Sequence, residues 1–165
     1  MYHSFQKIVL FILLLWVPGI SFCQDSIYAK FQYTKGHWKI PEGAELKPTP
    51  THFPLDCYHS MPTSNLNGKA SFMVHSFYYG EVIAAYPNDE QPFVIIKTGK
   101  YFLTYVGFEN LLVKKGDLVK KDQLLGKTAK YYDNSFNMEI YLFDSEKCLD
   151  PDEWFDHSCT LRNTE

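Results

Sequence analysis

The sequence predicts an antiparallel all-β domain that follows an extended N-terminal arm. Short apolar runs separated by turn-forming residues recur from residue 71 onward, which is typical of a sheet made of short strands. Residues 135–143 alternate between apolar and polar side chains, which is the period of a strand with one buried face. In addition, no segment has the apolar spacing of a long amphipathic helix.

The first 23 residues have the pattern of a signal peptide. Lys7 precedes an apolar run from Ile8 to Ile20, and this run is shorter than the roughly 20 residues that span a bilayer. Ser21 and Cys23 fit a cleavage site, so we expect a mature protein that starts near Gln24. It would be secreted or periplasmic and would have no membrane span after cleavage. Lipidation at Cys23 and an uncleaved anchor are the alternatives.

Composition narrows the class of partner. The net charge is −3 at pH 7, which gives no reason to expect a nucleic acid as the partner.

Export permits disulfides, and Cys57, Cys148 and Cys159 remain after cleavage. Because three is an odd number, at least one thiol stays unpaired within the monomer, and Cys148 can pair with either of the others.

The mature chain divides into three parts. Residues 24–69 are rich in proline and other turn formers, which predicts an extended arm and loop. Residues 70–155 contain the predicted strands and form one domain, and residues 156–165 are a short C-terminal tail.

Two local features of the strand-rich part predict particular elements of the sheet. Phe93-Val94-Ile95-Ile96 is a compact apolar run, and Thr98-Gly99-Lys100 is a hairpin turn that leads into a strand at residues 101–106. Residues 152–156 are expected to form a single helical turn.

Several motifs occur in a characteristic order over about ninety residues. They are Val74-His75-Ser76 with Gly80-Glu81-Val82, the segment from Val113 to Gly126, Asn137-Met138-Glu139-Ile140, and Leu149-Asp150-Pro151 with Trp154. This order and spacing resembles the lysostaphin/LytM-type zinc metallopeptidases, with Asp122 in place of one glycine. The resemblance implies a LytM-like barrel-sandwich fold, also called the duplicated hybrid motif.

The resemblance also implies that catalysis has been lost. The family needs a Zn²⁺ with an open position for water and histidines that move protons. Its paired histidines fall on Ser135 and Asn137, and a further one falls on Gly107. Because serine and asparagine are poor zinc ligands and glycine has no side chain, we expect a degenerate member without a metal cofactor.

The first ligand pair of the family has the spacing His-x-x-x-Asp. His52 and Asp56 have this spacing and are candidates for relics of a metal site, if about ten residues are inserted before Val74. An active zinc peptidase would then have to use an unusual ligand set.

The resemblance places a ligand groove around five residues, which are Tyr105, Gly107, Ser135, Asn137 and Glu139. Further tyrosines at positions 78, 79, 131 and 132 either line such a groove or form half-buried sheet surface.

These observations favour an exported, non-catalytic module that binds a cell-wall peptide, a glycan or an envelope protein and regulates cell-wall hydrolysis. The alternatives are an active zinc endopeptidase that cleaves peptidoglycan cross-links and a purely structural exported β-domain. A lipoyl carrier, suggested by Gly68-Lys69-Ala70 before Gly80, is disfavoured because the next Gly-Asp turn, at Gly116, comes too late.

Overall fold

The computed structural model describes residues 35–47, 62–131, 133–145 and 147–158, and their regular structure is almost entirely β-strand. In chain order the strands are β1 (Ala44–Lys47), β2 (Ser64–Gly68), β3 (Met73–His75), β4 (Gly80–Tyr86), β5 (Phe93–Thr98), β6 (Tyr101–Val106), β7 (Phe108–Leu111), β8 (Leu118–Val119), β9 (Leu124–Thr128), β10 (Phe136–Asp144) and β11 (Lys147–Leu149). A 3-10 turn, η1 (Pro151–Trp154), follows β11. Within these ranges no helix is long and apolar enough to cross a membrane.

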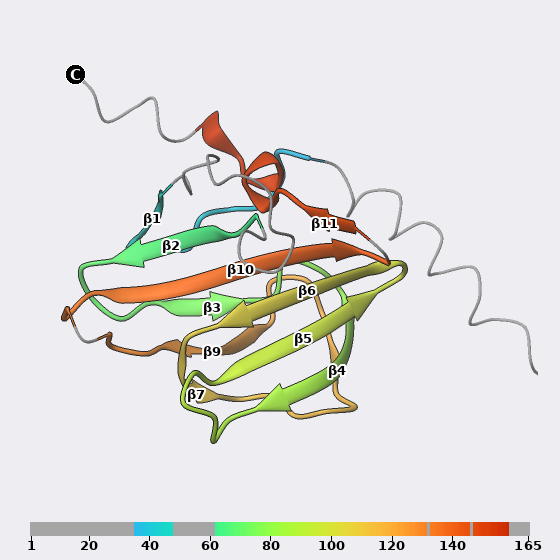
Figure 1. The fold of residues 1–165 in the computed structure, drawn as a ribbon, viewed down its shortest axis with the longest axis horizontal. Helices are drawn as coiled ribbons and strands as arrows, with labels where there is room; N and C mark the ends of the chain where they lie inside the picture. The colour runs from blue at the N-terminus through green and yellow to red at the C-terminus, as the bar shows by residue number, and fades with distance from the viewer. Residues whose placement is uncertain (1–34, 48–61, 132, 146, 159–165) are drawn as a thin grey trace, which may run out of the picture. The chain divides into compact units, whose positions relative to one another are not determined.

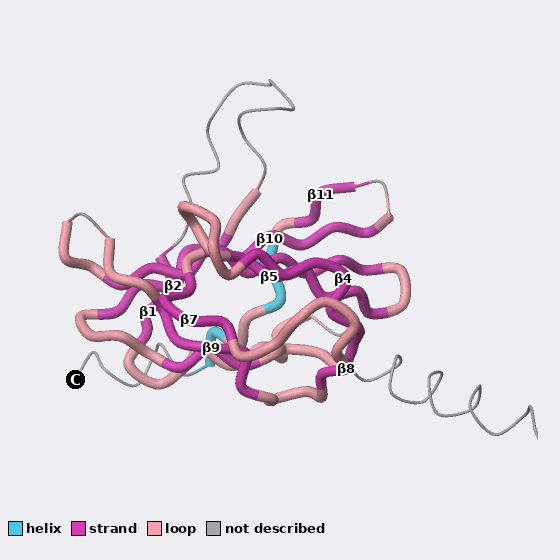
Figure 2. The backbone as a smooth tube through the Cα atoms, turned by 90° about the horizontal axis from the view of Figure 1, so that it is seen from below, coloured by secondary structure: helices cyan, strands magenta, loops and turns pink. Residues whose placement is uncertain are grey.

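The strands form two antiparallel sheets, which confirms the predicted fold class. The larger sheet has the order β1-β2-β10-β6-β5-β4-β8, with β11 also paired to β10, and the smaller one has the order β3-β9-β7 (Figure 1). In Figure 2 the strands β7 and β9 lie in a second layer on one side of β5 and β10. The two sheets form an open sandwich and do not close into a barrel.

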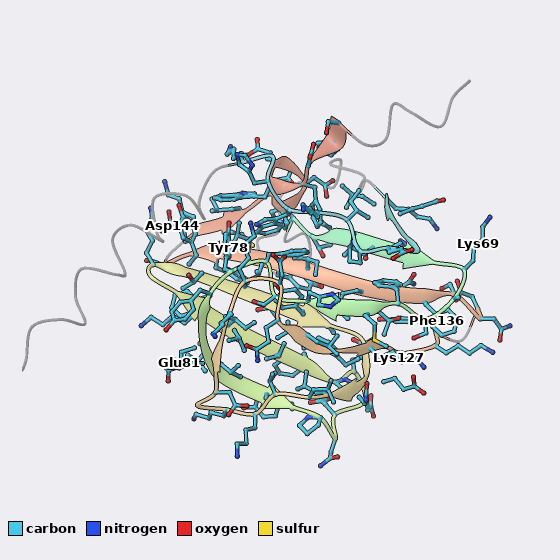
Figure 3. All side chains as sticks on the ribbon, turned by 180° about the vertical axis from the view of Figure 1, so that it is seen from behind. Lys69, Tyr78, Glu81, Lys127, Phe136 and Asp144 are labelled. Atoms are coloured by element: carbon cyan, nitrogen blue, oxygen red, sulfur yellow. The ribbon has the colours of Figure 1, made fainter. Side chains whose placement is uncertain are left out.

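Strand β10 crosses the domain from Phe136 at one end to Asp144 at the other (Figure 3). Its alternation has the predicted phase, because Met138, Ile140 and Leu142 are fully buried and the residues between them are not. The adjacent strand β6, and β5 beyond it, have the same two-residue burial pattern. The core of the sandwich is therefore built from one face of the larger sheet.

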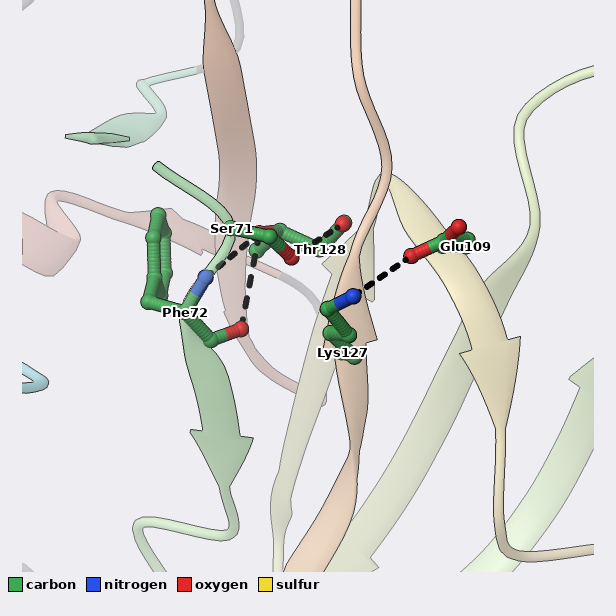
Figure 4. A network of polar contacts seen from close by, with 5 residues as sticks. All are labelled: Ser71, Phe72, Glu109, Lys127 and Thr128. Atoms are coloured by element: carbon green, nitrogen blue, oxygen red, sulfur yellow. Dashed lines mark hydrogen bonds and ion pairs between the residues drawn. The ribbon is translucent and has the colours of Figure 1, made fainter. Parts of the chain in front are cut away.

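The smaller sheet is held by a buried threonine. The hydroxyl of Thr128 on β9 accepts a hydrogen bond from the backbone N–H of Phe72 at 3.1 Å, and the Thr128 carbonyl accepts one from the Ser71 hydroxyl at 2.9 Å (Figure 4). On the exposed side, Lys127 forms an ion pair with Glu109 on β7. These contacts join the residues just before β3, and Glu109 on β7, to the central strand β9.

Two turns have backbones that suit the residues that form them. Thr98 and Tyr101 are register partners, so Gly99 and Lys100 form a two-residue hairpin loop, as predicted. Asp122, which stands where the resembling family has a glycine, adopts φ +62°. Aspartate is one of the few side chains that tolerate this left-handed region, so the turn keeps its shape without the glycine.

The larger sheet extends further toward the N-terminus than expected. Strands β1 and β2 come from the segment that the sequence assigned to an arm, yet β2 pairs with β10 and β1 pairs with β2. The sequence of β2 is Ser-Asn-Leu-Asn-Gly, in which Leu66 is the one apolar side chain. Asparagine and glycine are uncommon in strands, so pairing with β10 rather than local preference makes this segment a strand.

An aromatic cluster fastens the N-terminal segment to the C-terminal turn. The Trp38 backbone N–H donates to the Trp154 carbonyl at 2.8 Å, and the Asp156 N–H donates to the Trp38 carbonyl at 2.8 Å. The Trp38 ring stacks on Phe77 at 4.6 Å and meets Phe155 edge-on at 5.3 Å. Both ends of the described chain are therefore packed into one core.

We expect Trp38→Ala to lower the free energy of unfolding by about 3–5 kcal/mol, because it removes a large buried ring and leaves a cavity. Urea denaturation followed by circular dichroism measures this loss. Leu118→Ala is the control, since Leu118 is 64% exposed whereas Trp38 is 2% exposed. A loss at Trp38 no larger than that at Leu118 would contradict the stabilising role of the Trp38 aromatic cluster.

Candidate functional site

The candidate site lies on the outer face of β10, opposite the core. Asn137, Glu139 and Tyr141 point to this face because they alternate with the buried residues of the same strand. On the neighbouring strand β2, Asn67 is the register partner of Asn137, and Asn65 is the register partner of Glu139. Directly paired residues share a face, so two strands present amide and carboxylate groups side by side.

The chemistry of this face centres on Glu139. The Tyr141 hydroxyl donates a hydrogen bond of 2.7 Å to the Glu139 carboxylate. Burial, followed by this hydrogen bond and the negative charge of Glu139, raises the pKa of Tyr141 to about 12. Burial and the charge of Glu139 also raise the pKa of Tyr131. We call Tyr131, Asn137, Glu139 and Tyr141 the Glu139 cluster.

Two polar atoms of the Glu139 cluster are buried without a hydrogen-bond partner among the described residues. They are the side-chain oxygen of Asn137 and the hydroxyl of Tyr131. A buried polar group without a partner costs free energy, so such groups mark places where water or a ligand completes the bonding. The carboxylate of Glu139 is in no ion pair among the described residues. Most of the hydrogen bonds that the cluster can still form are ones in which it is the acceptor, at the Asn137 oxygen and the Glu139 carboxylate.

Tyr105 lies on the opposite face from the Glu139 cluster. Its side chain is fully buried, and its hydroxyl accepts a hydrogen bond of 2.9 Å from the backbone N–H of Phe77. Burial raises the pKa of Tyr105 well above its ordinary value. Of the five predicted groove residues, this one is therefore part of the core.

Gly107 and Ser135 flank the cluster without adding a side chain to it. Gly107 has φ +110°, and a Cβ added there would lie 2.7 Å from the Asn137 carbonyl oxygen. Ser135 is used locally, since its hydroxyl donates 2.5 Å to the Asp133 carboxylate and its N–H donates 2.9 Å to the same oxygen. These two hydrogen bonds lower the pKa of Asp133.

The described residues at the predicted zinc positions do not fit that metal. Asn137 offers a neutral amide, Ser135 is engaged with Asp133, and Gly107 has no side chain. No group of three or more His, Cys, Asp or Glu side chains in the described ranges is arranged to hold a metal ion. The relic candidates His52 and Asp56 lie outside the described residues, so their role stays a prediction.

The thiols are only partly described. Cys148 lies on β11, where burial raises the pKa of its thiol. Cys57 and Cys159 are outside the described residues, and the pairing of Cys148 with either of them stays a prediction.

Sequence reasoning missed part of the Glu139 cluster and its neighbours. Tyr141 could have been found, because it shares the phase of Asn137 and Glu139 on one strand. Asn65 and Asn67 could not, because only the pairing of β2 with β10 brings them to this face. Tyr131 is a candidate from the sequence, which leaves open whether it lines a groove or forms half-buried sheet surface. It comes from the loop after β9, where no periodic signal indicates the position of its ring.

Comparison with known proteins gives matches at the level of structure. No protein-family model and no curated protein matches the sequence. A chain from the SpoIIIAH–SpoIIQ complex is 15% identical with a TM-score of 0.56, over 67% of this chain and 91% of that one. A putative M23 peptidase from Pseudomonas aeruginosa is 16% identical with a TM-score of 0.55, over 84% of this chain and 65% of that one.

A third similar structure is the catalytic domain of the prophage-encoded M23 protein EnpA from Enterococcus faecalis. It is 15% identical with a TM-score of 0.53, over 67% of this chain and 91% of that one. The resemblance to the lysostaphin/LytM-type peptidases is thereby confirmed for the fold.

We expect the pKa of Tyr141 to fall below about 12 in Glu139→Gln but to stay above 10, because burial, its largest cause, remains. Titration of ¹³C-labelled tyrosine by NMR measures this shift. Glu109→Gln, on the smaller sheet, is the matched control and should leave the value unchanged. An unchanged pKa in Glu139→Gln would show that the hydrogen bond and charge of Glu139 do not act on Tyr141.

Proposed function

We propose that this domain, which has the fold of the M23 peptidases, is an exported, non-catalytic module. In this proposal it binds a cell-wall peptide, a glycan or an envelope protein on the outer face of β10, and it acts in the periplasm or outside the cell. The observation that carries the proposal is the Glu139 cluster, which offers hydrogen-bond acceptors and includes Asn137, one of the positions at which the resemblance implies a histidine in the family.

The chemistry of the cluster favours a ligand with N–H donors. The Glu139 carboxylate accepts a hydrogen bond from Tyr141, and the Asn137 side-chain oxygen is an acceptor without a partner among the described residues. Such acceptors pair best with ammonium or amide groups. A peptide supplies amide N–H groups along its backbone and ammonium groups at its terminus and side chains. A peptide or protein segment therefore fits this face better than an acidic ligand does.

The face next to the cluster is suited to a side chain with apolar surface. Val106 on β6 is the register partner of Glu139, and Phe93 on β5 is in turn the register partner of Val106. Phe93 stacks on Tyr86 with ring centroids 4.7 Å apart, and Tyr86 is 52% exposed. One row across the sheet thus runs from a carboxylate to two aromatic rings, and such mixed surfaces are typical of peptide sites.

The similar structures support both kinds of partner without deciding between them. One belongs to a complex of two proteins, SpoIIIAH and SpoIIQ, which favours a protein partner. The others are M23 peptidases, which favours a peptide as the ligand.

We expect the purified protein to bind less than about 0.1 zinc ion per chain and to leave cell-wall peptides uncleaved, because a catalytic site needs about three protein ligands. Metal analysis and a peptide-cleavage assay measure the two quantities. The variant Ser135→His with Asn137→His should gain zinc if His52 and Asp56 are relics of the site. Gly107→His is omitted because its positive φ and the nearby carbonyl oxygen leave no room for a side chain.

Near-stoichiometric zinc together with cleavage by the unmodified protein would overturn the non-catalytic proposal in favour of an active endopeptidase. If the double variant binds no zinc, this result counts only against His52 and Asp56 as relics of a metal site. It does not count against the non-catalytic proposal.

A synthetic cell-wall stem peptide with a free side-chain amine should bind the full chain, and Glu139→Gln should weaken it about tenfold, because hydrogen bonds to charged groups contribute roughly 1.5–3 kcal/mol. Isothermal titration calorimetry measures the affinity. The same peptide with its side-chain amine acetylated tests the need for the ammonium group. Glu109→Gln is the control variant. Equal affinity of Glu139→Gln and the unmodified protein would remove the cluster from the binding surface.

A further inference from the structure

A second surface feature lies away from β10 and is not used by the proposed function. It is a cavity of about 260 Å³ whose walls are three segments, residues 37–41, residues 75–77 and the turn at 121–122. None of these segments belongs to β2, β6 or β10, which carry the candidate site described above.

The walls of this cavity are fixed by backbone hydrogen bonds. The Ser76 N–H donates to the Gln123 carbonyl and the Asp122 N–H donates to the Ser76 carbonyl, both at 2.8 Å, which ties the turn to the end of β3. On the other side, Trp38 is tied to the C-terminal turn by the two backbone hydrogen bonds given above. A ligand would therefore meet a preformed site and would not have to order these segments on binding.

The floor of the cavity is apolar and aromatic. Trp38 and Phe77 both line it and stack nearly parallel, with an angle of 11° between their planes. Ile40 and Pro41 add aliphatic surface. The volume is below the roughly 300–1,000 Å³ that holds a drug-sized ligand, so the cavity suits a small group or the end of a chain.

The rim of the cavity is mainly basic. His37, Lys39, His75 and Lys121 line it, with Asp122 as the single acid. Neither lysine is in an ion pair with a described residue. Lysine ammonium groups only donate hydrogen bonds, and they favour carboxylate acceptors over neutral ones.

One further carboxylate lies near the rim. Asp156 interacts with His37, and the Ser158 N–H donates to this carboxylate at 2.9 Å. The two lysines still outnumber Asp122 among the residues that line the cavity itself.

From the apolar floor and the basic rim we propose that this cavity binds a carboxylate carried on a small apolar body, such as a short-chain acid or the C-terminus of a peptide. The floor accepts the apolar part, and Lys39 and Lys121 contact the carboxylate.

Butyrate is the probe that tests this site. Added to the full chain, it should give saturable ¹H–¹⁵N chemical-shift changes at His37, His75 and the Trp38 indole, with little change on β10. Butylammonium and butanol, which keep the apolar part but lack the carboxylate, should give none at these positions. Acetate and inorganic phosphate should bind more weakly than butyrate, because neither covers the aromatic floor.

A tripeptide with a free C-terminus, compared with its C-terminal amide, tells the two sources of a carboxylate apart. If the free tripeptide binds and its amide does not, a peptide C-terminus is a ligand. If butyrate binds and neither tripeptide does, the site takes small acids only. Either result supports the carboxylate site.

Charge variants test the rim. Lys39→Gln with Lys121→Gln should weaken butyrate about tenfold, since two charge-assisted contacts are lost. Lys120→Gln, next to Lys121 but outside the cavity lining, is the matched control and should change nothing. Asp122→Asn should tighten binding, because it removes the acid while asparagine tolerates the positive φ of this turn.

The proposal is overturned by equal butyrate affinity in the double lysine variant and the unmodified protein. It is also overturned if phosphate binds as tightly as butyrate, or if the chemical-shift changes fall elsewhere. None of these outcomes bears on the Glu139 cluster, so this inference and the proposed function can fail separately.

Discussion

The pairing of β10 is the constraint on which the rest of the structure depends. Its register with β6 covers residues 139–144, while β2 pairs with residues 136–140 and β11 with residues 142–144. A strand has two edges, so β2 and β11 lie end to end along the edge that β6 leaves free. The nine residues of β10 thereby position three neighbouring strands, and a one-residue slip would exchange the core face with the outer face.

Because one face of β10 carries core residues and the other carries the candidate site, the positions of the two sets of side chains depend on each other. The buried face of β10 fixes the phase in which Asn137, Glu139 and Tyr141 face outward. Gly107 adds a second constraint, because the corner between β6 and β7 lies against the Asn137 backbone and leaves no space for a side chain. In this fold a histidine at that corner would need a different backbone.

The ends of the described chain contribute through packing rather than through regular structure. Trp38 joins the N-terminal segment to η1, and the buried Ser64 hydroxyl on β2 donates to the Asp152 carboxylate in the same turn. The C-terminal turn therefore fastens both the start of the larger sheet and the wall of the basic-rimmed cavity.

The sequence by itself determined the all-β class, the phase of β10, the hairpin at Gly99 and the absence of histidines at three positions, because each depends on neighbouring residues. Only the tertiary structure decided that Tyr105 is a core residue, that Ser-Asn-Leu-Asn-Gly is a strand, and that Asn65 lies beside Glu139. It also decided that segments near residues 38, 76 and 121 enclose one cavity. Alternation along a strand is a local property, whereas these contacts join residues far apart in the chain and depend on how both sheets pack.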